Sequence, residues 1–358
     1  MFRNDRNSAS IPSMAATDHL TPRTRVTIRE IASLAGVSVA TVSRVMNGRD
    51  DVSPETRELV QRIVREHGYT ASRTARGLSA GRTGLIGTTV PVVHPPYFSF
   101  ILSGAAEALY ERDMRLVVCP TQHEHDREVS LLERLMHGTT DGGLLILPQE
   151  SAAELEQLLD AGYHFVVIDP LAPLNERIPA VSAAHSAGAD MAVKHLLSLG
   201  HRRIGAITGP RGWIATEDRL RGFHAALASA GILTPPELVV TGDFQIEPGA
   251  IAARKLLALA DRPTAIFAFN DNIAVGVMQV ARELGLRIPE DLSVVGFDDL
   301  EAAEIVTPAL TTIRQPIAEM GRMAASLLER LIEGQTIEAM HVELRTQLIV
   351  RDSTAPPA

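Results

Sequence analysis

The chain has 358 residues, enough for about two or three domains, and its 45% hydrophobic and 22% charged residues are ordinary for a folded globular protein. This composition excludes a disordered chain, a collagen and a disulfide scaffold. The single cysteine, Cys119, excludes an intramolecular disulfide and a cysteine-based zinc site. No apolar run approaches the ~18–20 residues that span a bilayer, and the N-terminus lacks the apolar core of a secretory signal. We therefore expect a cytoplasmic protein that does not contact a membrane.

The net charge of −9 hides an uneven distribution along the chain. Residues 22–82 hold 11 arginines, no lysine and six acidic residues, so this segment carries a charge of +5. Residues 1–21 are neutral, and the rest of the chain therefore carries −14. A short basic module joined to a long acidic body indicates that one end of the chain meets nucleic acid.

Dense helix signals begin near the start of the basic segment. Thr27 opens a capping box of the S/T-x-x-E type, and Gly36 suits the left-handed residue that ends a helix. Ser38 then caps a second helix, and Ser53 followed by proline starts a third. Three short helices, with a turn of about three or four residues between the first two, are typical of a helix-turn-helix unit.

The second predicted helix has the composition of a helix that reads DNA. Arg44 can pair bidentately with guanine, while Val39 and Ala40 at the helix start can contact thymine methyl groups. The short polar side chains that can donate to phosphates are Ser38, Thr41 and Asn47. The alternative is an ordinary capped amphipathic helix, against which the basic surroundings and the following Arg- and Ser-bearing linker weigh.

From Gly84 onward, short apolar runs alternate with amphipathic stretches. Apolar runs of this kind predict strands that are buried on both faces, and their alternation with helices predicts parallel sheets and an α/β fold. The predicted strands are 85–90, 116–118, 144–147, 165–168, 204–208, 238–240, 265–268 and 294–297, and the predicted helices include 98–112, 187–199, 215–230, 250–259 and 273–284. Because these units exceed one sheet, we expect two doubly wound parallel-sheet subdomains after an all-α N-terminal domain.

Long ordered motifs make the chain similar to one family. Residues 27–87 resemble the headpiece and hinge of the LacI/GalR family of bacterial transcription regulators. The likeness continues through HLLSLGHRRIGAITG (195–209), AFNDNIAVGVMQVARELGLRIPEDLSVVGFDDL (268–300) and PALTTIRQP (308–316), and covers about 25–352. The resemblance implies a DNA-binding repressor, not an enzyme, with an effector domain like type I periplasmic binding proteins. It also implies a homodimer on a pseudo-palindromic operator.

The resemblance divides the chain as well. It implies a mobile tail over 1–24, a helix-turn-helix domain over 25–70, a hinge over 71–83, an effector-binding and dimerisation domain over 84–352 with two interleaved subdomains, and a tail over 353–358. No heptad of leucines follows the last domain, so we expect a dimer and not a tetramer built on a coiled coil.

The family's DNA contacts map onto this chain residue by residue. Val39, Ala40 and Arg44 take the base-reading positions. The residues that serve the DNA backbone are then Thr27, Ser38, Thr41, Ser43 and Asn47. Leu78 matches the hinge leucine that inserts into the minor groove at the operator centre, where an apolar wedge unstacks a base step and bends the duplex. Short isolated helices are marginal, so this hinge should fold only on DNA.

Several side chains that directly follow predicted strands point to a binding site, because open α/β sheets bind ligands at the carboxyl ends of their strands. The resemblance implies effector contacts for Tyr97, Phe98, Arg219, Phe244, Asn270, Asp298 and Gln315, and Trp213 lies in a loop where relatives contact their effectors. Paired acceptors and a guanidinium suit vicinal hydroxyls, and an aromatic wall suits the face of a sugar. The alternative is structural, with Asn270 and Asp298 as helix caps and Arg219 paired with a neighbouring acid.

One segment departs from the family pattern. After Val181 the family often has an Asp-Asn pair, but this chain has Ser182, Ala183, Ala184 and His185. We therefore expect one ligand-facing acid to be missing and His185 to take the place of a polar neighbour. The effector is predicted to be a carbohydrate, with a purine or a sugar phosphate as alternatives.

Other functions are weakly indicated. His123 and His125 could form a metal pair but are more typical of a solvated helix start, so we expect no metal and no cofactor besides the small-molecule effector. No nucleophile motif or paired-carboxylate arrangement predicts catalysis, and Cys119 in an apolar strand is expected to be buried packing. A solute-binding protein of a transport system shares the predicted body fold and is the alternative function.

Overall fold

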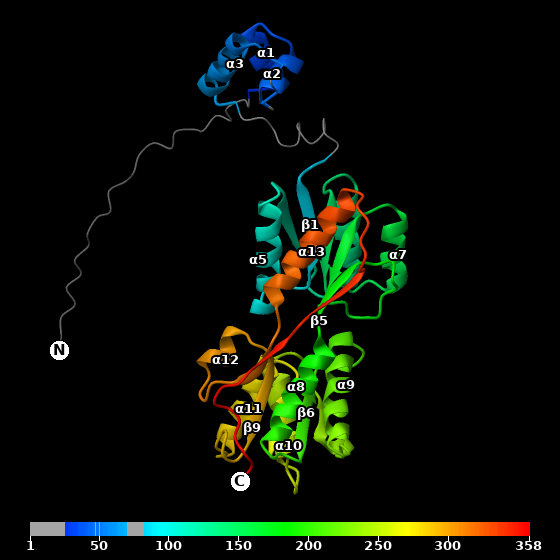
Figure 1. The fold of residues 1–358 in the computed structure, drawn as a ribbon, viewed down its shortest axis with the longest axis vertical. Coiled ribbons are helices and arrows are strands. Elements are labelled where there is room, and N and C mark those ends of the chain that lie inside the picture. The colour runs from blue at the N-terminus through cyan, green and yellow to red at the C-terminus, as the bar shows by residue number, and fades with distance from the viewer. Residues whose placement is uncertain (1–25, 47, 50, 70–81) are drawn as a thin grey trace, which may run out of the picture. The chain divides into compact units, whose positions relative to one another are not determined.

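The protein is described here by a computed structural model that covers residues 26–46, 48–49, 51–69 and 82–358. The chain divides into two compact units, Met1–Ser79 and Ala80–Ala358 (Figure 1). The predicted residues Asn47 and Leu78, and most of the predicted hinge, lie outside the described residues.

The first unit is a bundle of three helices, α1 (Ile28–Ala35), α2 (Val39–Met46) and α3 (Pro54–Glu66). Ile31, Val42 and Val60 are fully buried at its centre. The capping box at Thr27 is present, and Gly36 ends α1 with a φ of 63°, where a residue with a Cβ would be strained. The three predicted helices are therefore confirmed. On α3, Val60 is fully buried, whereas the neighbouring Leu59 is only half-buried.

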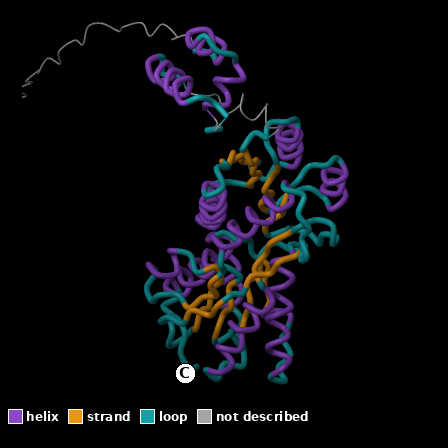
Figure 2. The backbone as a smooth tube through the Cα atoms, turned by 45° about the horizontal axis from the view of Figure 1, so that its top comes forward, coloured by secondary structure: helices purple, strands orange, loops and turns teal. Residues whose placement is uncertain are grey.

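The second unit contains two lobes, each built on a six-stranded sheet with helices on both faces (Figures 1 and 2). In the first lobe the strand order is β11-β5-β4-β3-β1-β2, and every neighbouring pair is parallel. Its elements are β1 (Leu85–Val90), α5 (Pro96–Tyr110), β2 (Arg115–Pro120), α6 (His125–Met136), β3 (Gly142–Ile146), α7 (Ala152–Asp160), β4 (Phe165–Ile168), β5 (Ala180–Ala183), α13 (Ile317–Ile332) and β11 (His341–Leu344). Helices α5 and α13 pack against each other on one face, and α6 and α7 cover the other.

The second lobe repeats this architecture with the order β12-β10-β9-β8-β6-β7, in which only the edge strand β12 is antiparallel to its neighbour. Its elements are α8 (His185–Ser198), β6 (Ile204–Thr208), α9 (Ile214–Ser229), a 3₁₀ turn (Pro236–Leu238), β7 (Val239–Thr241), α10 (Ile246–Leu257), β8 (Ala265–Ala268), α11 (Asp271–Glu283), β9 (Ser293–Asp298), α12 (Glu301–Ile305), β10 (Thr311–Arg314) and β12 (Gln347–Ile349). Helix α8 pairs with α9, and α10 pairs with α11.

The chain passes between the lobes three times, from β5 to α8, from β10 to α13 and from β11 to β12 (Figure 1). The two lobes are therefore interleaved in sequence, and the polypeptide segments that join them are short. This confirms the predicted fold class of two doubly wound subdomains. Four short strands and four helices were not predicted from the sequence, namely β5, β10, β11, β12, α6, α7, α12 and α13.

The C-terminal residues contact the second lobe beyond residue 352. Ser353 is fully buried, donates to the Val294 carbonyl at 2.6 Å and accepts from the Thr311 amide at 2.8 Å. The Ala355 carbonyl accepts from His201 Nε2 at 2.9 Å. The segment expected to be a tail thus adds hydrogen bonds to the sheet of the second lobe.

Candidate functional sites

The turn between α1 and α2 fixes where the second helix starts. Gly36 donates to the carbonyls of Ala32 and Ser33, which closes α1. Ser38 then begins α2, because its Oγ accepts from the Thr41 amide at 3.1 Å and its carbonyl accepts from the Val42 amide. The local hydrogen bonds therefore present the start of α2 as a capped and exposed helix end.

The side chains of α2 separate cleanly into two faces. Val42 and Val45 are buried in the core of the unit. The outward face carries most of the residues predicted to read DNA, with Ser38, Val39, Ala40 and Arg44 exposed and Thr41 and Ser43 half-buried. An exposed apolar Val39 at the start of a helix is what contact with a thymine methyl group requires.

Arg44 is held only loosely in this structure. Its Nε lies 3.5 Å from a carboxylate oxygen of Asp51, and both side chains are more than half exposed. An exposed pair of this kind contributes little, so the guanidinium is available to another partner. Thr27 is less available, because its amide donates to the Glu30 carboxylate at 2.6 Å and its hydroxyl takes part in the same cap.

The second unit contains a cavity of about 1000 Å³ at the carboxyl ends of the strands, between the two lobes. Both lobes contribute aromatic walls. The Tyr97 and Phe98 rings of the first lobe lie 5.5 Å apart, and the Trp213 and Phe244 rings of the second lobe lie 5.8 Å apart. Gly209 permits the latter arrangement, since a Cβ there would come within 2.2 Å of the Phe244 ring.

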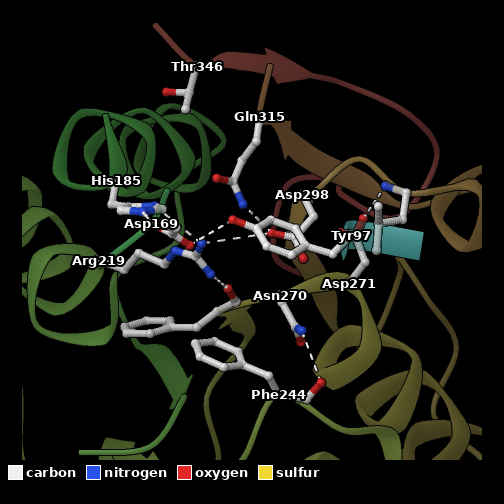
Figure 3. A network of polar contacts seen from close by, with 12 residues as sticks. Tyr97, Asp169, His185, Arg219, Phe244, Asn270, Asp271, Asp298, Gln315 and Thr346 are labelled. Carbon is white, nitrogen blue, oxygen red and sulfur yellow. Dashed lines mark hydrogen bonds and ion pairs between the residues drawn. The ribbon is translucent and has the colours of Figure 1, made fainter. Parts of the chain in front are cut away.

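Arg219 lies at the centre of the polar floor of this cavity (Figure 3). It is 3% exposed, and its guanidinium stacks on the Phe297 ring at 3.9 Å. Its Nη1 donates to the Phe269 carbonyl, and its Nη2 lies 3.3 Å from His185 Nδ1 and 3.8 Å from the Asp298 carboxylate. Arg219, which lies on α9, therefore connects residues at the strand ends of the second lobe with His185, which follows a segment that crosses between the lobes.

Asp169 continues this network into the first lobe (Figure 3). The Tyr97 hydroxyl donates to Asp169 Oδ2 at 2.7 Å, and His185 Nε2 lies 2.9 Å from Asp169 Oδ1. Asp169 and His185 are both buried. Asp169 follows β4 in the first lobe and His185 opens α8 in the second, so this contact links the lobes through buried polar groups.

Three ionisable groups of the cavity floor, Asp298, Asp169 and Tyr97, differ in their pKa. Burial raises the pKa of Asp298 to about 7, although the Arg219 charge and the Gln315 amide favour its carboxylate. Burial acts on Asp169 too, but His185, the Tyr97 hydroxyl and Arg219 outweigh it and lower the pKa of Asp169. Burial and the nearby Asp169 carboxylate raise the pKa of Tyr97 well above its usual range. Near neutral pH, Asp169 is thus an acceptor, Tyr97 is a donor, and Asp298 exchanges a proton.

Asp271 holds the loop that carries Asp298. Its Oδ2 accepts from the Leu300 amide at 2.8 Å, and its Oδ1 accepts from the Thr312 hydroxyl at 2.6 Å. Asp298 has a φ of 119° and Asp299 a φ of 59°, conformations that L-residues adopt only when neighbours enforce them. Burial and the nearby Asp298 raise the pKa of Asp271. Asp271 directly follows the predicted contact Asn270 but was not itself among the predicted effector contacts.

The structure brings the predicted effector residues together at the cavity. Those that line it are Tyr97, Phe98, Trp213, Arg219, Phe244, Asn270 and Asp298. Gln315 lies behind Asp298 and donates to it at 2.6 Å. Asn270 also has the structural role considered as the alternative, because its Oδ1 caps α11 by accepting from the Ile273 amide at 2.9 Å.

Asp169 is a buried cavity residue that was not among the predicted effector contacts. The acid that the family often has after Val181 is absent from this sequence, and Asp169 at the end of the neighbouring strand β4 places a carboxylate at the cavity. His185 does lie in the polar network, where it orients this carboxylate. The rule that ligands bind where parallel strands end would have found Asp169, because it directly follows a predicted strand.

Two other predictions concern Cys119 and the histidines near the start of α6. Cys119 was expected to be buried, but it is only half-buried because β2 forms an edge of its sheet. His125 contacts Glu154 at 3.0 Å, and within the described ranges no three histidine, cysteine or acidic side chains are placed to hold a metal ion. Of the helices in these ranges, none is long and apolar enough to cross a membrane.

A three-helix unit with an exposed second helix, followed in the same chain by two α/β lobes around a polar cavity, defines the class of ligand-responsive DNA-binding regulators. Residues 27–72 match the family described as bacterial regulatory proteins, lacI family, and residues 193–354 match the periplasmic binding protein-like domain. The chain belongs to the lacI family of transcriptional regulators. This membership confirms that the protein is a transcriptional regulator. The alternative function, a solute-binding protein of a transport system, is therefore rejected, and the family is not one of enzymes.

The similarity extends over nearly the whole chain. The chain is 38% identical to the HTH-type transcriptional regulator CelR of Thermobifida fusca, over 92% of this chain and 99% of that protein. A solved structure of the CelR–cellobiose complex shares 36% identity and a TM-score of 0.71, covering 92% of this chain and 100% of that one. The lac repressor dimer bound to operator and the anti-inducer ONPF shares 28% identity and a TM-score of 0.84, over 92% and 99% of the two chains.

Proposed function

We propose that this protein is a cytoplasmic repressor whose affinity for an operator is controlled by a small carbohydrate bound between the two lobes. One observation carries the proposal, namely the polar network centred on Arg219 at the floor of an aromatic-walled cavity. The network offers a guanidinium and two carboxyl groups, Asp169 and Asp298, within one site. Such groups match the alternating donors and acceptors of vicinal hydroxyls, while aromatic rings match the apolar face of a sugar ring.

The similarity to CelR supports this choice of ligand, because that regulator is known as a complex with cellobiose. The aromatic pairs at Tyr97 and Trp213 give this cavity the apolar surfaces that a sugar needs. A purine held between two aromatic rings would instead need a flat slot between parallel rings. Neither aromatic pair offers one, since the Tyr97 and Phe98 rings meet edge to face at 82° and Trp213 is tilted by 46° against Phe244.

The DNA-binding part of the proposal concerns a homodimer on a pseudo-palindromic operator. The lac repressor structure, a dimer on its operator, supports this arrangement. We assign base contacts to Val39, Ala40 and Arg44. Backbone contacts go to Thr27, Ser38, Thr41, Ser43 and Asn47, and minor-groove insertion goes to Leu78. Residues 25–70 would form the reading domain, 71–83 the hinge and 84–352 the effector and dimerisation domain.

Ligand control follows from the way the lobes are joined. Three short segments cross between them, and the Asp169–His185 contact bridges them inside the cavity. A ligand that binds one relative orientation of the lobes better than another shifts the population toward it, by no more than its difference in affinity. That shift would reach the hinge through β1, which directly follows it.

Trp213, the only tryptophan of the chain, reports on the cavity and provides the test. We expect one or more sugars in a screen to change its fluorescence, and the same sugars to change operator affinity in a mobility-shift titration. Trp213→Phe should abolish the signal while calorimetry still detects binding. Sugars that neither bind nor change operator affinity at millimolar concentration would refute the proposed control by a carbohydrate.

A further inference from the structure

The cavity is lined by more acidic than basic groups. Among the described residues around it, Arg219 is the one lysine or arginine, whereas four acids line the cavity, namely Asp169, Asp243, Glu247 and Asp298. On the proposed carbohydrate function, we propose that this site selects an uncharged saccharide of at least two rings and rejects the phosphorylated form. The proposal separates two ligand classes that both carry sugar rings.

Arg219 is already committed to protein partners. Its Nη1 donates to the Phe269 carbonyl, and its Nη2 faces His185 Nδ1 at 3.3 Å and Asp298 Oδ1 at 3.8 Å. Phosphate recognition by arginine depends on two parallel N–H donors from one guanidinium edge. The Nε of Arg219 has no partner, but it is buried and not accessible from the cavity, so this side chain presents no bidentate edge to a phosphate.

The neighbouring carboxylates add repulsion. His185 and Tyr97 keep Asp169 in its ionised form, and it lies in the same buried floor as Asp298. A phosphate monoester carries about −1.5 to −2 charges near neutral pH, and buried carboxylates repel such an anion more strongly than exposed ones would. A hydroxyl, in contrast, donates to either carboxylate without a charge penalty. The cavity floor therefore favours ligands whose hydrogen-bond donors are uncharged hydroxyl groups.

The rim continues this acidic pattern. Asp243 directly precedes Phe244, Glu247 lies in the first turn of α10, and both side chains are exposed. Two histidines, His94 and His123, are the other titratable groups at the rim, and they too are exposed. Asp298, with its pKa raised by burial to about 7, is mostly ionised at pH 8, so discrimination against an anion should be greatest near this pH.

The size of the cavity favours more than one ring. A volume of about 1000 Å³ lies at the upper end of the ~300–1000 Å³ typical of small-molecule pockets. Two aromatic pairs, one in each lobe, lie at its walls, Tyr97 with Phe98 and Trp213 with Phe244. Each pair can face one pyranose ring, whereas a single hexose would leave one apolar wall uncovered.

The full-length chain allows a direct test at pH 8. Trp213 fluorescence would be titrated with glucose, with cellobiose, maltose and sucrose, and with the 6-phosphates of these three disaccharides. We expect at least one neutral disaccharide to bind, its 6-phosphate to bind at least tenfold more weakly, and glucose to bind at least tenfold more weakly as well. Asp243→Asn combined with Glu247→Gln should narrow the gap between the neutral and the phosphorylated disaccharide.

Glu290→Gln is the matched control, because it also removes a negative charge but lies on an exposed loop and does not line the cavity. It should leave the gap unchanged. A 6-phosphate that binds as tightly as its neutral disaccharide and alters operator affinity would overturn the charge selection while leaving ligand control intact. Glucose that matches the disaccharides would overturn the size argument. Failure of every saccharide would overturn this inference together with the proposed carbohydrate function.

Discussion

The helix that is proposed to read DNA and the cavity that is proposed to bind the ligand use their polar residues in opposite ways. On α2 the side chains are exposed, and their contacts are local, as between Ser38 and Thr41. In the cavity the side chains are buried and meet partners from distant segments, as Tyr97 meets Asp169. Exposed local contacts contribute separately, whereas buried networks respond as units. Substitutions on α2 should therefore change one contact each, and substitutions in the cavity should disturb several.

The largest expected effect is that of Arg219→Ala. Removing a buried charge from its partners typically costs about 3–5 kcal/mol, because the remaining charge stays buried. Asp298 would lose this partner, and the Phe269 carbonyl would lose its donor. We expect the free energy of unfolding of the second unit to fall by about this amount in urea titrations.

Arg221→Ala is the matched control for this prediction. Arg221 lies on the same helix, but its side chain is 66% exposed, and its pair with Asp218 is worth about 0.2–1 kcal/mol at most. Adding Asp298→Asn to Arg219→Ala should restore part of the lost stability, since it removes the unpaired carboxylate. Equal losses in the two alanine variants would show that Arg219 is not part of a cooperative network.

The pH dependence of the two units should differ in sign. Glu150 follows β3, and both of its carboxylate oxygens are buried without a partner among the described residues. Burial, with the nearby Glu128, raises the pKa of Glu150 to about 8. The folded state therefore binds more protons than the unfolded state between the unfolded pKa of 4.5 and about 8, and stability falls as pH rises through this window.

Glu30 in the first unit shows the opposite shift. Hydrogen bonds from Thr27 lower its pKa, so its contribution is present above the unfolded pKa and is lost as pH falls through the folded pKa. In calorimetry at pH 3, 5, 7 and 9, Glu150→Gln should remove part of the alkaline loss of the second unit. Glu30→Gln should remove part of the acid loss of the first. Unchanged pH profiles in either variant would contradict the corresponding assignment.

Arg44→Ala should affect recognition and leave folding intact. A bidentate arginine–guanine pair is worth about 1–3 kcal/mol of discrimination against the wrong base, whereas the exposed contact of Arg44 with Asp51 adds little stability. We expect reduced preference for operator over mismatched sequences in competition mobility shifts. Arg62→Ala, an exposed arginine on α3, should keep the preference. A uniform loss of affinity on all sequences would mean that Arg44 contacts phosphate.

The sequence predicted the first unit well because its signals are local. The cap at Thr27, the left-handed Gly36 and the cap at Ser38 each act within a few residues. Strands buried on both faces, such as β8, were predicted equally well because they appear in the sequence as apolar runs. Strands such as β11, with exposed and half-buried residues in alternation, and the four-residue β5 carry no such run, so the segments that cross between lobes were not predicted.

The cavity was predictable only in part, for a related reason. Residues that directly follow strong strands, such as Asp298, were found from the sequence. The same rule applies to Asp169, but its pairing with His185 and Tyr97, which approach it from other segments, could not be predicted from the sequence. Cys119 was misjudged because exposure of β2 follows from its edge position in the sheet, and strand order is a tertiary property. Residues next to a strand or helix can thus be predicted from the sequence, whereas contacts between segments that the fold brings together cannot.

The smallest expected effect separates two roles of Ser38. Its Oγ caps α2, and the proposed function also places it against a DNA phosphate. Ser38→Ala should cost about 1 kcal/mol of stability in the first unit through the lost cap. Ser38→Asp retains a capping oxygen and places a negative charge at the positive end of the helix, so stability should be kept. The same charge would repel a phosphate, so operator affinity should fall about tenfold, or ~1.4 kcal/mol.

Melting of the first unit and mobility shifts of the full chain would therefore diverge for Ser38→Asp and change together for Ser38→Ala. If Ser38→Asp keeps both stability and operator affinity, the cap is the whole function of Ser38, and even on the exposed helix a residue predicted to contact DNA serves the fold alone.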